Sequence, residues 1–177
     1  MSDDALRYPI GRFDLERPVT AAQLADAIAG LAALPARVRE AVRGLDDGQL
    51  DTPYRPGGWT PRQLVHHLAD SHLNGYTRLK LALTEDEPVI KPYRQELWAE
   101  LADSRLPVGV SLGVLDGVHE RWVTLLRELG PAELARTFRH PELGRAVRLD
   151  TQAAHYDWHG RHHTAHILGL RERMGWR

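Results

Sequence analysis

Apolar side chains recur at intervals of three and four residues in several long stretches of this chain, which is the spacing of an amphipathic helix. The first stretch carries Leu24, Ile28 and Leu31. Pro35 should break this helix, because its ring nitrogen cannot donate a hydrogen bond to the preceding turn. A second helix is therefore expected from there to about residue 45.

Three further long helices are predicted from similar patterns and from their end signals. Thr60 is a good N-cap and Pro61 occupies the favoured first helical position, so a helix should start there. The crossover that follows should hold a short helix near residues 95–101, and its length permits a bundle that is not in simple up-down order. The long helices are expected at residues 60–83, 109–129 and 151–174, with Asp150 capping the last.

The remaining segments read as connections. Residues 137–140 and 146–149 flank a Pro-Glu-Leu-Gly turn and resemble a small β-hairpin. Residues 1–19 are expected to be irregular and residues 46–59 to be rich in turns. A chain of 177 residues has the usual length of one domain. We therefore expect a single all-α domain over residues 1–177, a four-helix bundle with short extra helices and at most a small β-hairpin.

Composition excludes several kinds of protein. The formal net charge is −1 and the sequence has no basic block, which argues against nucleic acid as a partner. The absence of cysteine excludes disulfides and thiolate ligands, so His, Asp or Glu must hold any metal. No apolar run approaches the ~20 residues of a membrane span, and the N-terminus lacks the features of a signal peptide. A cytoplasmic protein without a membrane partner is expected.

Half of the ten histidines lie close together on the last predicted helix. At about 100° per residue, these five rings fall within an arc of roughly 100°. Pairs four residues apart let two imidazoles reach one ion, and a third ring from His66 or His67 would complete a three-histidine site with open positions. The alternative is that the rings are core or surface residues bonded to carbonyls and carboxylates. Five histidines on one helix face favour metal binding over this alternative. They are His155, His159, His162, His163 and His166.

The sequence around two other polar residues says less about their roles. His119 has no histidine neighbour on its helix and is interpreted as structural. Asp70 follows His67 by three residues, and it either accepts a hydrogen bond that orients an imidazole or is a solvated acid. The usual zinc-protease motif, His-Glu-x-x-His, is absent, because Gly160 follows His159. No glutamate is therefore placed as the usual general base, and the Glu-x-x-His pairs of di-iron bundles are missing too.

Several segments together resemble the YfiT-like branch of the DinB superfamily, a group of metal-dependent helical bundles that includes bacillithiol S-transferases. The resemblance covers almost the whole chain and its motifs are specific. They lie at residues 50–54, 57–60, 65–72, 80–86, 89–93, 97–101 and 158–167.

The resemblance implies a ligand set that spacing alone left open. It points to His67 in the His-Leu-Ala-Asp segment, together with the His159 and His163 pair on the last helix. Many members have Gly-Gln after the last ligand, where this chain has Ala165-His166, so His166 is a candidate pocket residue. The resemblance also implies one divalent ion per chain, zinc or nickel, in a cytoplasmic protein that is commonly a homodimer.

Three functions are compatible with these residues. The resemblance favours a divalent-metal-dependent thiol S-transferase, which would join a low-molecular-weight thiol such as bacillithiol to a small electrophile. The first alternative is a metal-dependent hydrolase that uses water in place of the thiol. The second is a bundle that binds metal without catalysis. The missing general-base motif also leans toward thiol transfer.

Overall fold

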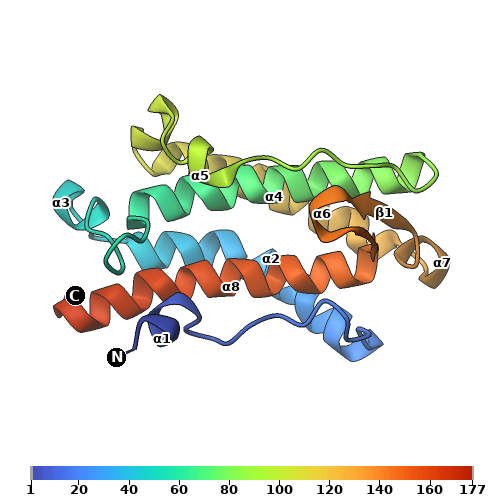
Figure 1. Cartoon of the computed structure of the whole chain (residues 1–177), viewed down its shortest axis with the longest axis horizontal. Coiled ribbons are helices and arrows are strands. Elements are labelled where there is room, and N and C mark those ends of the chain that lie inside the picture. Colours follow the sequence, from blue (N-terminus) through green and yellow to red (C-terminus); the bar gives the residue numbers. More distant parts are fainter. Residues whose placement is uncertain (1, 177) are drawn as a thin grey trace.

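Four long helices pack side by side, and short helices and one hairpin connect them (Figure 1). This computed structural model describes residues 2–176. The all-α four-helix bundle expected from the sequence is confirmed. The long helices are α2 (Ala21–Val42), α4 (Pro61–Thr84), α6 (Gly109–Glu128) and α8 (Leu149–Met174).

The connecting segments contain more short helices than the sequence predicted. The irregular lead-in contains one helix, and the turn-rich segment after α2 contains another. The hairpin is present, with Phe138 opposite Val147 and Gly144 in the left-handed conformation at its turn. The short elements are α1 (Asp3–Arg7), α3 (Asp47–Leu50), α5 (Gln95–Trp98), α7 (Pro131–Leu134), two 3₁₀ turns (Ala102–Arg105 and Pro141–Leu143), β1 (Thr137–His140) and β2 (Arg145–Arg148).

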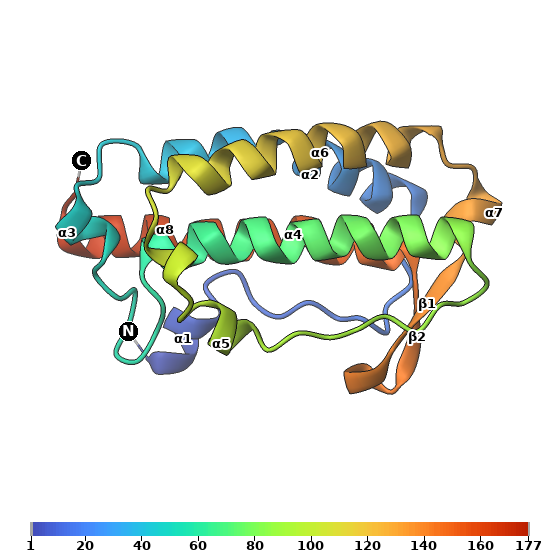
Figure 2. The ribbon, with the colours of Figure 1, turned by 90° about the horizontal axis from the view of Figure 1, so that it is seen from above.

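The order of the helices around the bundle differs from their order in the chain. Helix α2 packs against α6 and α8, and α4 packs against the same two helices, so α2 and α4 lie diagonally. Helices α4 and α6 run in one direction and α2 and α8 in the other, because the segment after α4 returns along the bundle (Figures 1 and 2). Helices α4 and α8, which carry most of the histidines, are therefore antiparallel neighbours.

Helix ends follow the predicted signals except at the start of α8. The Thr60 hydroxyl accepts a hydrogen bond from the Gln63 amide, and Gln63 reaches back to the Thr60 amide, which completes a capping box. The prediction that Asp150 is the N-cap of the last helix was wrong. Helix α8 begins at Leu149, and Asp150 lies in its first turn, where its carboxylate accepts from the Thr151 amide at 2.6 Å. A carboxylate there still complements the positive end of the helix dipole.

Helix α2 runs without a break through Pro35, contrary to the expectation from the sequence. Leu34 and Val38 on either side of the proline are almost completely buried, so tertiary packing holds the segment helical. The proline deprives the Leu31 carbonyl of its usual donor four residues later. The imidazole of His119 on α6 supplies a donor instead, with Nδ1 2.7 Å from that carbonyl oxygen.

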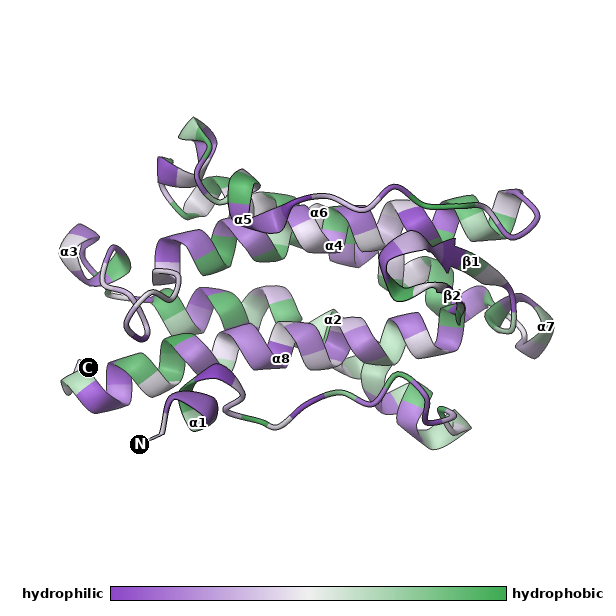
Figure 3. Cartoon of the chain, viewed as in Figure 1, coloured by the Kyte–Doolittle hydropathy of each residue, from purple (hydrophilic) through white to green (hydrophobic). Residues whose placement is uncertain are grey.

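The core has two apolar clusters separated by a polar layer. One cluster centres on residues such as Leu64 and Leu115, and the other on Leu79 and Trp122. His72 on α4, His119 on α6 and His162 and His166 on α8 are buried and lie between the two clusters in sequence on their helices. Hydrophilic residues occupy the middle of α8 (Figure 3). Within residues 2–176, no helix combines the length and apolar character needed to cross a membrane.

Candidate metal centre

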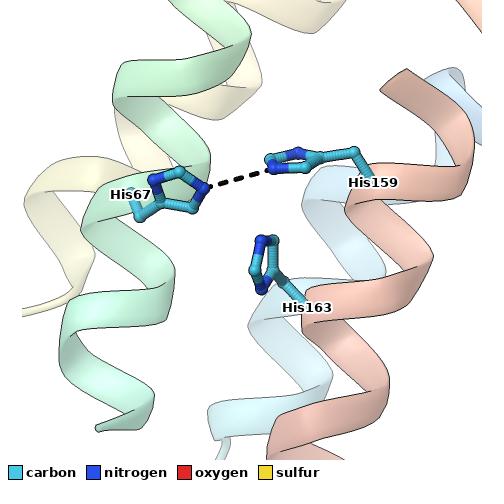
Figure 4. Close-up of side chains that lie close together, drawn as sticks. All are labelled: His67, His159 and His163. Atoms are coloured by element: carbon cyan, nitrogen blue, oxygen red, sulfur yellow. Dashed lines mark hydrogen bonds between the residues drawn. The ribbon is translucent and has the colours of Figure 1, made fainter. Parts of the chain in front are cut away.

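Three histidine rings meet where α4 and α8 face each other. His67 comes from α4, and His159 and His163 come from successive turns of α8. One ring nitrogen of each lies within 4.8 Å of the others, and the three side chains point toward one another (Figure 4). The i, i+4 spacing therefore puts two rings on one helix face, and the packing of α4 on α8 adds the third.

The distances between these nitrogens suit ligands of one ion. The Nε2 atoms of His67 and His159 are 3.2 Å apart. Two imidazole nitrogens bound ~2.0–2.1 Å from one tetrahedral ion would lie about 3.3 Å apart. Three neutral nitrogens and no carboxylate form a donor set that zinc, nickel and iron accept. The residues present therefore fit a divalent ion with positions left open for other ligands.

Burial keeps these imidazoles neutral at ordinary pH. It lowers the pKa of His67 to about 4. It also holds the pKa values of His159 and His163 well below 6.5, and the neighbouring histidines lower them further, because a second positive ring would be repelled. Neutral imidazole is the form that binds metal.

A second histidine group shares His163 with the first. His162, His163 and His166 also bring ring nitrogens within 4.8 Å. However, Nε2 of His166 lies 3.1 Å from the Arg7 carbonyl oxygen, and its Nδ1 lies 3.3 Å from Nδ1 of His163. Both nitrogens of His166 are therefore engaged, which leaves His67, His159 and His163 as the better ligand set.

The three-histidine group borders a cavity of about 630 Å³. His159 and His163 form part of its wall, and Trp59, which also lines it, packs its ring 4.6 Å from that of His67. The carboxylates on the wall are Glu96 and Glu142. The site can thus admit a small molecule next to the rings.

Several residues that line this cavity can donate hydrogen bonds. Arg78 and Arg94 both line it. The indole nitrogen of Trp158 and the Nδ1 atoms of His140 and His162 are buried without a hydrogen-bond partner among the described residues. A buried indole N–H can only donate. These residues therefore suit a ligand that carries acceptors, such as a carboxylate.

Other residues singled out from the sequence lie outside the group. His66 faces away and bonds to the Ser111 hydroxyl at 2.7 Å and to the Leu106 carbonyl at 2.9 Å. His155 lines the cavity without joining the three rings. The carboxylate of Asp70 makes no hydrogen bond to an imidazole within residues 2–176, and burial raises its pKa to about 6. Of the two readings for Asp70, orientation of an imidazole has no support.

Sequence reasoning missed His72 and undervalued His119. Both are buried, and their rings bond to each other at 2.9 Å. His72 in turn bonds to His159, with Nε2 3.2 Å from Nδ1 of His159. His72 follows His67 by five residues and so falls on a different helix face. A search for histidines four residues apart therefore does not find its hydrogen bond to His159.

Known proteins resemble this chain over nearly its whole length. The sequence pattern of the DinB superfamily matches residues 30–167. Proteins of Bacillus cereus (strain ATCC 14579) and Bacillus mycoides (strain KBAB4), each named "Putative metal-dependent hydrolase", are 55% identical over 171 residues, which cover 97% of this chain and 98% of theirs. The solved structure of YfiT from Bacillus subtilis is 45% identical, with a TM-score of 0.94 over 98% of this chain and 99% of that one. It is described as "a probable metal-dependent hydrolase with an unusual four-helix bundle topology".

Proposed function

The chain belongs to the DinB superfamily, and from this premise we propose that it is a divalent-metal-dependent enzyme whose ion is held by His67, His159 and His163. The carrying observation is the group of three imidazoles, two of which, His159 and His163, line a cavity of about 630 Å³. An ion held there would supply a Lewis-acid centre that lowers the pKa of a thiol or water. Zinc and nickel both suit an all-imidazole donor set.

We further propose that the reaction is transfer of a low-molecular-weight thiol, such as bacillithiol, to a small electrophile. An alkyl thiol has a pKa near ~8.5, so little of it is thiolate at neutral pH. The three-ring group contains no carboxylate to act as a base for water, whereas a thiol needs only a lowered pKa to become a nucleophile. The absence of cysteine means that the thiol must be a cosubstrate.

The donors that line the cavity support a cosubstrate with acceptor groups. Arg78 lies close enough to His140 and His155 for its charge to lower the pKa of both rings. Within residues 2–176, no carboxylate forms an ion pair with Arg78. A carboxylate of the thiol could bind this guanidinium and fix the sulfur end of the molecule near the histidines.

Hydrolysis is the second candidate, and two observations favour it. Relatives more than half identical to this chain carry the name "Putative metal-dependent hydrolase". Glu96 lines the cavity and lies close enough to His67 for its charge to raise the pKa of that ring. In this reaction Glu96 would take a proton from the attacking water.

Product analysis separates the two reactions. The zinc- or nickel-loaded protein is incubated with an alkyl halide, with and without bacillithiol, and separately with ester and amide substrates. Thiol transfer predicts a thioether conjugate that requires both metal and thiol, and it predicts that Glu96→Gln keeps the activity. Metal-stripped protein and His159→Ala are the controls. Metal-dependent ester or amide cleavage without thiol, abolished by Glu96→Gln, would replace transfer by hydrolysis.

A further inference from the structure

The unusual proline inside α2 has a consequence for the histidines. Pro35 has no N–H, so the carbonyl of Leu31 is left without its helical donor. Nδ1 of His119 lies 2.7 Å from this oxygen. A carbonyl oxygen can only accept a hydrogen bond, so Nδ1 of His119 must carry the hydrogen.

This single assignment determines the tautomers of the next two rings. The rings of His72 and His119 are buried, and a neutral imidazole carries one N–H. Since His119 has its hydrogen on Nδ1, its Nε2 accepts from Nδ1 of His72 at 2.9 Å. Nε2 of His72 then accepts from Nδ1 of His159 at 3.2 Å. The lone pair of His159 is left on Nε2, the atom that faces His67.

The second ligand on α8 has a similar arrangement. The Arg7 carbonyl belongs to the last residue of α1, where helical carbonyls lack donors. Nε2 of His166 lies 3.1 Å from it and must donate. Nδ1 of His166 then accepts from Nδ1 of His163 at 3.3 Å, and the lone pair of His163 is left on Nε2.

We propose that two buried histidine relays set the tautomers of the metal ligands on α8. The first runs from the Leu31 carbonyl through His119 and His72 to His159. The second runs from the Arg7 carbonyl through His166 to His163. Each relay starts from a main-chain carbonyl that a helix leaves without a donor, and each ends with a lone pair on Nε2. The inference rests on the proposed metal site; His72, His119 and His166 are positioning residues in it.

The relays would matter for affinity because only a lone pair binds an ion. A ligand histidine normally donates its other N–H to a neighbour, and loss of that neighbour costs about 10–100-fold in metal affinity. In His119→Leu, Nδ1 of His72 loses its acceptor. His72 can then place its hydrogen on Nε2 and donate to His159, which moves the His159 hydrogen onto the metal-binding nitrogen.

The test compares metal affinity in matched variants. Zinc affinity is measured by competition with a chelator at pH 7.5, and unfolding by urea is measured separately. His119→Leu should bind zinc about 10–100-fold more weakly. His119→Gln, whose side-chain oxygen can still accept from His72, should recover most of this loss.

His66→Leu is the control for a merely structural role. His66 is buried and makes two hydrogen bonds, as His119 does, but it has no link to the three rings. This variant should lose stability while its zinc affinity stays within about twofold of wild type, as for sites that share no partners. Equal zinc affinities in His119→Leu and His66→Leu would overturn the proposal.

The tautomers can also be observed in the unmutated protein. In metal-free protein with ¹⁵N-labelled histidine, two-bond ¹H–¹⁵N correlations should show His72, His159 and His163 protonated on Nδ1. Protonation of His159 or His163 on Nε2 would refute the relays even if the leucine variant fails to fold. A wild-type protein that binds no divalent ion would refute the proposed function instead, and the spectrum would still decide the tautomers.

Discussion

Replacement of Gly160 by alanine tests how closely α2 and α8 must approach to form the site. Gly160 precedes the turn that carries His163 and follows His159 directly. A Cβ at this position would lie 2.7 Å from Cδ1 of Leu34 and 3.1 Å from its Cγ, and closer still to Cδ2. Leu34 is 2% exposed in the core, so it has little room to turn away.

Two opposing effects determine how much Gly160→Ala changes the free energy of unfolding. Alanine is favoured over glycine in a helix interior by about 1 kcal/mol. Overpacking of a well-filled core costs about 1–3 kcal/mol. Gly160→Ala should therefore lower the free energy of unfolding by about 0–2 kcal/mol.

Gly117 on α6 is the matched control, because a Cβ there meets nothing within 4 Å. Gly117→Ala should raise the free energy of unfolding by about 0.5–1 kcal/mol. Urea unfolding of the metal-free proteins, followed by circular dichroism, gives both values. The overpacking contribution is their difference, about 1–3 kcal/mol. Equal stabilisation by the two alanines would refute the close packing of α2 on α8.

Three further outcomes are expected. His159→Ala should lose its metal, and elemental analysis showing full occupancy would contradict the ligand assignment. Acidification should destabilise the metal-free protein, because burial lowers the pKa values of His67 and His119 from 6.5 to about 4. The unfolded chain therefore takes up protons at a higher pH than the folded protein, and the free energy of unfolding falls as the pH drops below 6.5. The loss is up to about 3 kcal/mol per ring, and urea midpoints that are equal at pH 7.5 and pH 5 would argue against it. Arg78→Gln should raise the KM for a carboxylate-bearing thiol about tenfold or more and leave that for 2-mercaptoethanol unchanged; equal effects on both thiols would exclude carboxylate binding by Arg78.

The sequence by itself determined three of the four long helices, the hairpin and the arc of histidines on α8 that forms one side of the candidate site. These features depend on interactions between residues close in sequence: the apolar spacing, the capping box at Thr60, and Gly175, which adopts the left-handed conformation at the end of α8. The arc of histidines on α8 follows from helical geometry alone. The choice of His67 over His66 came from a resemblance, and the structure brings His67 to the α8 pair.

Only the tertiary structure decided which residues of the other helices contact the α8 histidines and α2. Pro35 was misjudged because its local cost was visible in the sequence, whereas the burial of Leu34 and the donor from His119 come from other helices. The link from His119 through His72 to His159 joins three helices. Hydrogen bonds across a bundle depend on which helices are neighbours and on their register, and no periodicity within one helix contains that information.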